Sequence, residues 1–240
     1  MKRRVIGGCV LAKHKAIGTK LEIVKTATRL IWEKGYTAMS TRMVAAELDI
    51  SVGNITYYYP SKDDLLSILV NSLCKFQRKF IEDVAEDGIS SVMAVCLELM
   101  TMTSACESNP IAKDFFISSY QSPVTLKIIR ESDTQKTETV FSEYCKGWSE
   151  TDFIIAENIV SGIEYSMLVT EDTDEVSLEK RIESSLDVIM KLYDVPENIR
   201  KSLLQSVLSM DYREIGRNIL NEFCIYVDEK NKAQLEKIAK

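Results

Sequence analysis

The chain has 240 residues, of which 45% are hydrophobic and 28% are charged, an ordinary globular composition that excludes wholesale disorder. Only 4 Pro and 9 Gly interrupt it, which favours an all-helical fold, and the single histidine, His14, excludes histidine-based zinc sites and triads outside the amino-terminal tail. The net charge of −6 conceals a split, because residues 1–80 hold 14 basic and 6 acidic residues whereas the remainder hold 16 and 30. A basic first third on an acidic body indicates a polyanion-binding head.

Residues 1–16 are basic, and we expect them to form a flexible arm, with insertion into a minor groove of DNA as the alternative. The first helix is predicted over residues 19–34, where apolar side chains recur at helical spacing. Thr19 is its expected N-cap, with Glu22 in the capping-box position. Gly35 is its expected carboxy-terminal stop.

A helix-turn-helix is predicted over residues 40–59. Ser40 is the expected cap of a short helix at about 41–48, and Ser51 is the expected cap of a third helix at about 52–58. Pro60 ends the third helix, and a three-residue connection separates the two. A helix of this size fits the major groove of DNA.

Three consecutive tyrosines close the third helix and match no single amphipathic period. We expect Tyr59 to pack inside the domain, Ile50 and Ile55 to fill the space between the two short helices, and the other side chains to face outward. Asparagine, threonine and tyrosine hydroxyls and amides suit base edges and phosphates. The residues predicted to contact DNA are Ser40, Thr41, Arg42, Ser51, Val52, Gly53, Asn54, Thr56, Tyr57, Tyr58 and Lys62.

A long helix is predicted from Ser61 or Lys62, with an apolar stripe that persists for more than 20 residues, enough to join two bodies. The later helices are predicted at about 90–106, 111–121, 124–146, 151–169, 176–193, 197–208 and 211–237. We therefore predict an all-α protein with a DNA-binding domain at 17–75 and a helical domain at 76–240. No apolar run has transmembrane length, so we expect no membrane partner. The scattered cysteines are typical of reduced thiols in a cytoplasmic protein, which is the localisation we expect.

The segment GYTAMSTRMVAAELDISVGNITYYYPSKDDL resembles the DNA-binding domain of the tetracycline-repressor (TetR-like) family of bacterial transcription regulators. The resemblance covers residues 17–75 and departs from the family pattern at two positions. Asp49 stands where the family has a turn glycine, and Thr56 stands where it has a phosphate-contacting tyrosine, with Tyr57 next to it. The matching residues are Gly35, Tyr36, Ser40, Val44, Ala45, Ile50, Ser51, Gly53, Ile55, Tyr58, Tyr59, Lys62 and Leu65.

The resemblance implies a homodimer that binds a palindromic double-stranded DNA operator, most often as a repressor. It also implies that a small hydrophobic or amphipathic effector binds in the helical domain and releases the operator. From the residues themselves we expect no enzymatic activity and no cofactor, because no thiol has a visible activating base. The alternative is a helical small-molecule-binding or protein-interaction protein whose helix-turn-helix does not act on DNA.

Several features of the helical domain allow two interpretations. The residues that could line an effector pocket rather than plain core are Met93, Met100, Phe116, Tyr120, Trp148 and Tyr165. The apolar stripe from Tyr212 to Val227 fits a dimer interface or the core of one chain. The acidic stretch 170–179 fits a cation site or a solvated loop, and lacks calcium-loop spacing.

Other polar residues of the helical domain give no sign of chemistry. Glu157 and Glu164 share a helical face, but no E-x-x-H element accompanies them, which argues against a di-metal site. Six scattered cysteines without a C-x-x-C pair are expected to be reduced thiols without a catalytic role.

Overall fold

The computed structural model describes residues 4–86 and 90–239, and within these ranges the chain is entirely helical. The helices are α1 (Arg4–Lys34), α2 (Thr41–Glu47), α3 (Val52–Tyr58), α4 (Lys62–Glu86), α5 (Ser91–Ser108), α6 (Pro110–Gln121), α7 (Pro123–Val140), α8 (Glu150–Val169), α9 (Leu178–Leu192), α10 (Glu197–Leu208) and α11 (Tyr212–Ala239).

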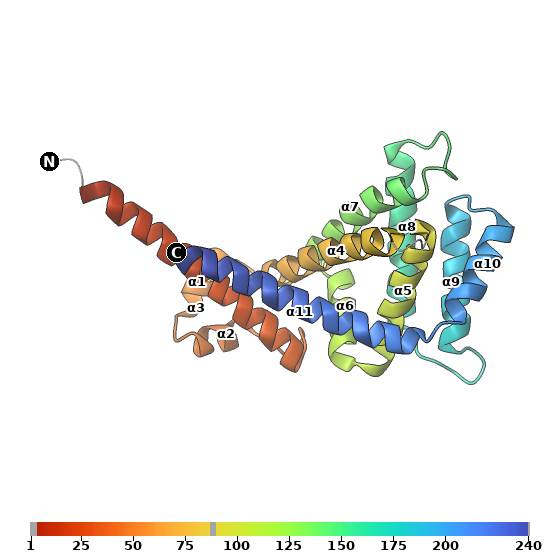
Figure 1. The fold of residues 1–240 in the computed structure, drawn as a ribbon. Coiled ribbons are helices and arrows are strands. Elements are labelled where there is room, and N and C mark those ends of the chain that lie inside the picture. The colour runs from red at the N-terminus through yellow and green to blue at the C-terminus, as the bar shows by residue number, and fades with distance from the viewer. Residues whose placement is uncertain (1–3, 87–89, 240) are drawn as a thin grey trace.

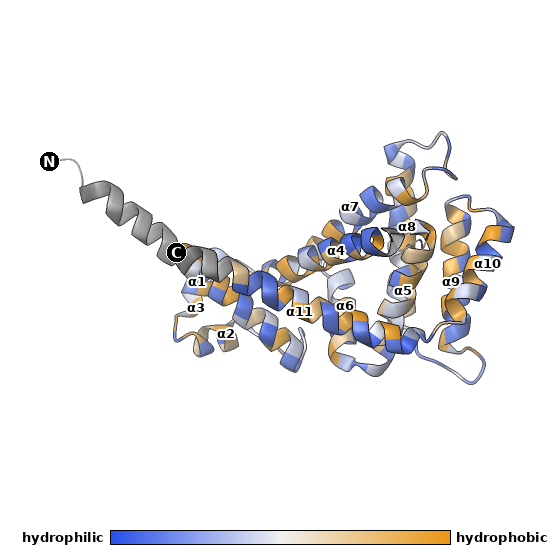
Figure 2. Ribbon diagram, viewed as in Figure 1, coloured by the Kyte–Doolittle hydropathy of each residue, from blue (hydrophilic) through white to orange (hydrophobic). Residues whose placement is uncertain are grey.

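The helices form a small amino-terminal head and a larger body, joined by two long helices (Figure 1). Helices α1, α2 and α3 make the head, and α4 leaves it to enter the body, where it packs against α5 and α7. Helix α11 returns from the body and packs along α5, α4 and α1. Hydrophobic and hydrophilic residues alternate along α4 and α11 (Figure 2), as expected of helices with one buried face.

The centre of the body is α5, which is buried from Val92 to Cys106 along almost its whole surface. Helix α11 crosses it at Gly216, where a Cβ atom would lie 2.8 Å from the backbone oxygen of Thr101 and 2.6 Å from Ser104 Oγ. Only glycine lets the two backbones approach this closely. Tyr212, Phe223 and Val227 are all buried, so the apolar stripe of α11 belongs to the core of the single chain.

The predicted starts of α2 and α3 and the predicted end of α1 are confirmed. Helices α2 and α3 occupy the predicted segments, each capped by its serine. Gly35 follows the last residue of α1 with φ +89°, the left-handed conformation that favours glycine at a helix end.

Two helix boundaries were predicted wrongly. Helix α1 begins at Arg4 rather than at Thr19, so residues 4–16, which we expected to form a flexible arm, are helical. No proline interrupts this segment, and its glycines weaken a helix without ending it.

Helix α7 ends at Val140 rather than at residue 146. The chain turns there, with Gly147 at φ +89°, and Ser149 and Asp152 then form a capping box that starts α8. Helix α4 runs without interruption through residue 75, so the predicted domain boundary at 75/76 stays a prediction. Among the described residues no helix is both long and apolar enough to cross a membrane. The cysteines described there are unpaired thiols.

Candidate DNA-binding surface

A serine side chain caps the start of each of the two short helices, and Asp49 shapes the turn between them. Ser40 Oγ accepts a hydrogen bond from the Met43 amide at 3.3 Å, and Ser51 Oγ accepts one from the Asn54 amide at 3.2 Å. Asp49, the residue at the family's glycine position, adopts φ 51°. Aspartate is one of the few residues that tolerate this left-handed conformation, so the departure is accommodated without disturbing the turn.

Helix α3 has one buried residue and presents the others to the outside. Ile55 is fully buried in the head. Tyr57 is 81% exposed, so its ring does not pack in the core of the head. Its ring meets Tyr58, which is half-buried, edge-on at 5.0 Å between ring centroids. The residues of this surface that are exposed are Arg42, Ser51, Val52, Gly53, Asn54, Thr56 and Tyr57, whereas Ser40, Thr41, Tyr58 and Lys62 are intermediate.

Tyr59 is structural, as its place in the sequence predicted. The ring is buried, and its hydroxyl donates to the backbone oxygen of Lys20 in α1 at 3.5 Å. Burial raises the pKa of Tyr59 to about 12, so the phenol stays neutral. The three tyrosines therefore divide into one that anchors α3 to α1 and two that carry the aromatic edge of the exposed face.

The geometry restricts two of the predicted DNA contacts. Thr56 Oγ1 donates to the backbone oxygens of Val52 at 3.3 Å and Gly53 at 3.2 Å, so its hydroxyl hydrogen is used inside the helix. Lys62 Nζ donates to the Thr37 oxygen at 3.2 Å and lies 4.0 Å from the centroid of the Tyr36 ring. Burial lowers the pKa of Lys62, against the opposing influence of nearby carboxylates. Lys62 is thus a structural tether of the head.

Polar contacts also fix the head to the body. The Thr37 amide donates to Asp114 Oδ2 in α6 at 2.8 Å, and the Thr37 hydroxyl donates to the other carboxylate oxygen. Asp63, at the start of α4, accepts from the Tyr36 hydroxyl at 2.5 Å and from Ser122 Oγ at 2.7 Å. These hydrogen bonds hold the pKa of Asp63 below its usual range. A displacement of α6 would therefore be transmitted to the loop before α2.

The residues predicted to line an effector pocket separate into different parts of the body. Tyr120 donates to Glu164 at 2.9 Å, and its ring lies 6.5 Å from that of Tyr165. Trp148, in the connection before α8, packs against Phe153 and Tyr193. Of the six residues, only Phe116 borders the small apolar cavity between α4, α5 and α11. The buried ones are Met100, Phe116 and Tyr120, and the half-buried ones are Met93, Trp148 and Tyr165.

A buried charge cluster, which the sequence did not reveal as one site, occupies the middle of the body. Lys136 in α7 pairs with Glu98 in α5 at 2.9 Å and with Asp133 at 2.9 Å. Two further buried carboxyls on α8 accept phenol hydrogens, Glu157 from Tyr193 and Glu164 from Tyr120.

One lysine thus faces four buried carboxyl groups. Its single positive charge cannot balance four negative charges, which favours the protonated form of some of the carboxyl groups. Burial raises the pKa of Glu98 and Glu164, and it raises that of Glu157 to about 7. Burial acts to lower the pKa of Lys136, but the carboxylates of Asp133 and Glu98 outweigh it and hold that pKa high. Lys136 therefore remains charged in the body at neutral pH.

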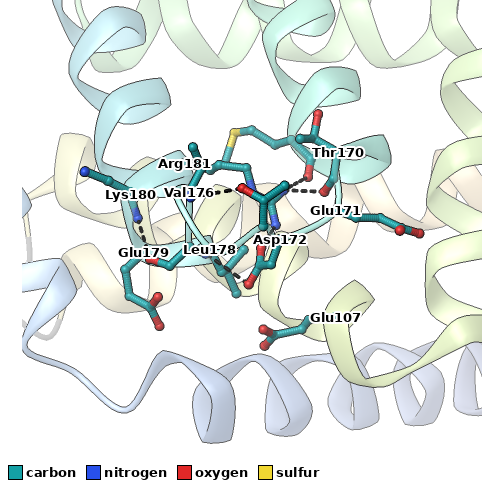
Figure 3. A network of polar contacts seen from close by, with 12 residues as sticks. Glu107, Thr170, Glu171, Asp172, Val176, Leu178, Glu179, Lys180 and Arg181 are labelled. Atoms are coloured by element: carbon teal, nitrogen blue, oxygen red, sulfur yellow. Dashed lines mark hydrogen bonds and ion pairs between the residues drawn. The ribbon is translucent and has the colours of Figure 1, made fainter.

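The side chain of Arg181 holds the acidic loop between α8 and α9 through hydrogen bonds and an ion pair (Figure 3). Arg181 donates to the backbone oxygens of Met167 at 3.0 Å and Thr170 at 2.6 Å and pairs with the Asp172 carboxylate. The second oxygen of Asp172 accepts from the Leu178 amide at 3.2 Å. Within the described parts of the chain, no group of three or more His, Cys, Asp or Glu side chains is placed to hold a metal ion.

Comparisons with known proteins agree with the geometry of the head. Residues 23–68 match the family model described as "Bacterial regulatory proteins, tetR family". A protein of Bacillus subtilis (strain 168), named "Probable HTH-type transcriptional regulator YttP", is 31% identical over 71 residues. That match covers 30% of this chain and 34% of the relative, so the chain aligns with about a third of the relative's length.

Two solved structures that align with the chain are the following. A gamma-butyrolactone receptor described as ArpA-like has 15% identity and a TM-score of 0.47, with 81% of this chain and 98% of that chain covered. CprB, a TetR family protein from S. coelicolor A3(2), has 16% identity and a TM-score of 0.44, with the same two shares covered.

Proposed function

We propose that the chain, whose residues 23–68 match the tetR family model, is a transcriptional repressor that binds a palindromic operator as a homodimer. A small-molecule effector bound in the helical body releases the DNA. The observation that supports this proposal best is α3 itself. Its short exposed face carries Asn54 and Tyr57 on a helix that is capped, anchored by Tyr59 and free of packing on its outer side.

The chemistry of the surface assigns different roles to its residues. Asn54 is exposed and offers an amide that can bond an adenine edge in the major groove. Arg42 is exposed on α2 and suits a phosphate oxygen. Because α3 contains neither lysine nor arginine, the electrostatic part of the affinity must come from the elements around it.

The test is a fluorescence-anisotropy titration with duplex DNA from directly upstream of the gene that encodes the chain. We expect Arg42→Ala to weaken binding to all sequences and to flatten the slope of log affinity against log salt by about 1. Asn54→Ala should relax base preference at one position per half-site. Lys201→Ala, on exposed α10, is the control that leaves binding unchanged. If neither head variant differs from this control, α3 does not contact DNA.

The homodimer is proposed to form through α8. Its outer face exposes Ile154 by 45%, Ile155 by 54% and Ile159 by 49%, although its inner face is already packed in the body. A helix that is hydrophobic on all sides is normally buried on all sides. Gly162 and Ser166 continue this exposed face with small side chains that allow a second helix to approach closely.

Light scattering after size exclusion tests this interface. We expect the double variant Ile155→Asp, Ile159→Asp to be monomeric at concentrations at which the unmodified protein is dimeric, because each symmetric interface would bury four carboxylates. Ile225→Asp, on an exposed position of α11, is the matched control and should remain dimeric. A dimeric double variant would exclude α8 from the interface.

A further inference from the structure

The inner face of α8 carries two buried carboxyl groups. Glu157 is 1% exposed and Glu164 is 4% exposed, and they lie two turns apart on the same side of the helix. Each accepts a hydrogen bond from a neutral phenol of a neighbouring element. Tyr193, at the end of α9, donates to Glu157, and Tyr120 of α6 donates to Glu164 at 2.9 Å. Phenols hold these carboxyl groups in place without balancing their charge.

The positive charge of the cluster is already used elsewhere. Lys136 Nζ lies 2.9 Å from Glu98 Oε1 and 2.9 Å from Asp133 Oδ1, so it joins α7 to α5 rather than to α8. Arg130 of α7 does reach α8, but its Nε donates to Ser161 Oγ at 2.8 Å. The titratable and charged groups that face the two glutamates are Glu98 of α5, Tyr120 of α6, Arg130, Asp133 and Lys136 of α7, and Tyr193 after α9.

The cluster leaves little space for another counter-charge. The hollow that Glu157 and Glu164 share with Asp133, Lys136 and Tyr193 has a volume of ≈ 10 Å³, enough for one water molecule at most and too small for a hydrated cation. A proton needs no such space, because it binds on the carboxyl oxygen itself. Since an unbalanced buried carboxylate is costly, the packed arrangement of α8 favours protonated glutamates. Burial accordingly raises the pKa of Glu157 to about 7 and raises that of Glu164.

The outer face of the same helix is the proposed dimer interface. Ile155 and Ile159 are exposed there, whereas the other sides of α8 pack against α5, α6, α7 and α9. Loss of both protons would place two new negative charges near the Asp133 carboxylate. Repulsion between these charges, and their need for water, would act to move α8 away from α7. A symmetric interface uses the same side chains of both copies, so a displaced α8 would weaken it twice over.

We propose that this cluster is a pH-dependent switch that controls the packing of α8. While Glu157 and Glu164 carry protons, α8 stays packed in the body and presents an ordered dimer face. When they lose these protons as the pH rises, α8 loosens and the dimer dissociates more readily. The effect on the dimer rests on the proposed function, because it takes α8 to be the interface.

Sedimentation velocity at pH 6 and pH 8, at constant ionic strength, measures the dissociation constant of the dimer. We expect this constant to rise by about tenfold or more between the two pH values in the unmodified protein. It should stay the same in the double variant Glu157→Gln, Glu164→Gln, because glutamine does not ionise. Glu157→Gln alone should show a smaller rise than the unmodified protein, which tests the switch even if the double variant does not fold.

The matched control is the double variant Glu222→Gln, Glu229→Gln. It removes two exposed carboxylates with the same seven-residue spacing from α11, so it changes the net charge equally without touching the cluster. This variant should keep the full pH dependence of the dimer. Circular dichroism confirms that each variant is folded.

The indole of Trp148 gives a second measurement that does not require a dimer. Its ring lies 5.9 Å from that of Tyr193, the residue that donates to Glu157, and the chain has 2 tryptophans. In a Trp32→Phe background, we expect the emission of Trp148 to change with a midpoint near pH 7. Adding Glu157→Gln should remove this change.

The outcomes separate the switch from the proposed function. A dimer of equal affinity at pH 6 and pH 8 would overturn the switch and leave the homodimer in place. A pH dependence of the same size in the unmodified protein and in the folded double variant of the cluster would overturn it as well. A chain that is monomeric at both pH values would refute the proposed homodimer. In that chain, Trp148 emission that titrates only when Glu157 is present would still support the switch in α8, and emission that does not titrate would overturn it.

Discussion

Replacing Glu157 with glutamine should remove a pH-dependent loss of stability from the body. Glu157 lies on α8 and accepts a hydrogen bond from Tyr193, and the charged groups that surround it are Asp133 and Lys136 of α7 together with Glu164 of its own helix. Glutamine keeps the size of the side chain and retains an oxygen to accept the Tyr193 hydrogen. The substitution therefore removes the titration with little change in packing.

The magnitude follows from the shift of the pKa. Burial raises the pKa of Glu157 from 4.5 to about 7 in the folded chain. The folded state then binds more protons than the unfolded state between these two values, so the free energy of unfolding falls as the pH rises from about 4.5 to 7 and levels off above. At about 1.4 kcal/mol per pKa unit, this group alone lowers the stability by roughly 2–3 kcal/mol between pH 5 and pH 8.

Urea denaturation at fixed protein concentration, repeated from pH 5 to pH 8, measures the effect. We expect Glu157→Gln to gain stability relative to the unmodified protein by about 2 kcal/mol or more over this interval. Glu150→Gln, at an exposed position in the first turn of the same helix, is the matched control and should leave the pH profile unchanged. Parallel profiles for the unmodified protein and Glu157→Gln would show that this carboxyl is ionised in the folded state, and the reasoning about the cluster would be wrong.

Two backbone predictions can be measured by the same denaturation experiment. Gly216→Ala should lower the free energy of unfolding by about 1–3 kcal/mol, because the new Cβ would meet the Thr101 oxygen. Gly18→Ala is the control, and it should stabilise its helix because open space surrounds that position. Equal effects of the two substitutions would contradict the close crossing of α11 and α5. Asp49→Gly should raise the free energy of unfolding by roughly 0.5–1 kcal/mol, because glycine adopts the left-handed conformation without strain. Asp194→Gly, at φ 54°, should have the same effect. A loss of stability in both variants would refute the backbone argument.

The head was predictable because its signals are local. Ser40 and Ser51 mark the starts of α2 and α3, and Pro60 bounds the end of α3. Pro60 ends the helix at Tyr58 and leaves Tyr59 in an extended conformation, so that Tyr59 is buried, Tyr58 half-buried and Tyr57 exposed. The role of Lys62 was not predictable in the same way. Its contact with Tyr36 and Thr37 depends on where the loop after α1 passes, which no short-range pattern encodes.

The body was predictable only as a set of helices. The apolar stripe of α11 fits a dimer interface and an internal core equally well, because both bury the same side chains. Lys136 lies in the polar segment RESDTQKTET, whose composition is typical of a solvent-exposed helix. Its burial follows from the packing of α7 against α4 and α8, with Glu98 of α5 as its partner. Partners so distant in sequence leave no periodic signal.

The arrangement of the two joining helices has a consequence for any response of the head. With α4 alone, the head could tilt about a single connection, and the body would control its orientation weakly. Helix α11 adds a second connection that meets α1 through Phe223 and Trp32 and meets α4 through Lys230 and Ser72. Helix α6 adds a third contact, because the Thr37 amide donates to Asp114 at 2.8 Å. The orientation of the head is therefore set jointly by α4, α6 and α11, and a change in the spacing of any of these helices would reach α3 through α1 and the loop before α2.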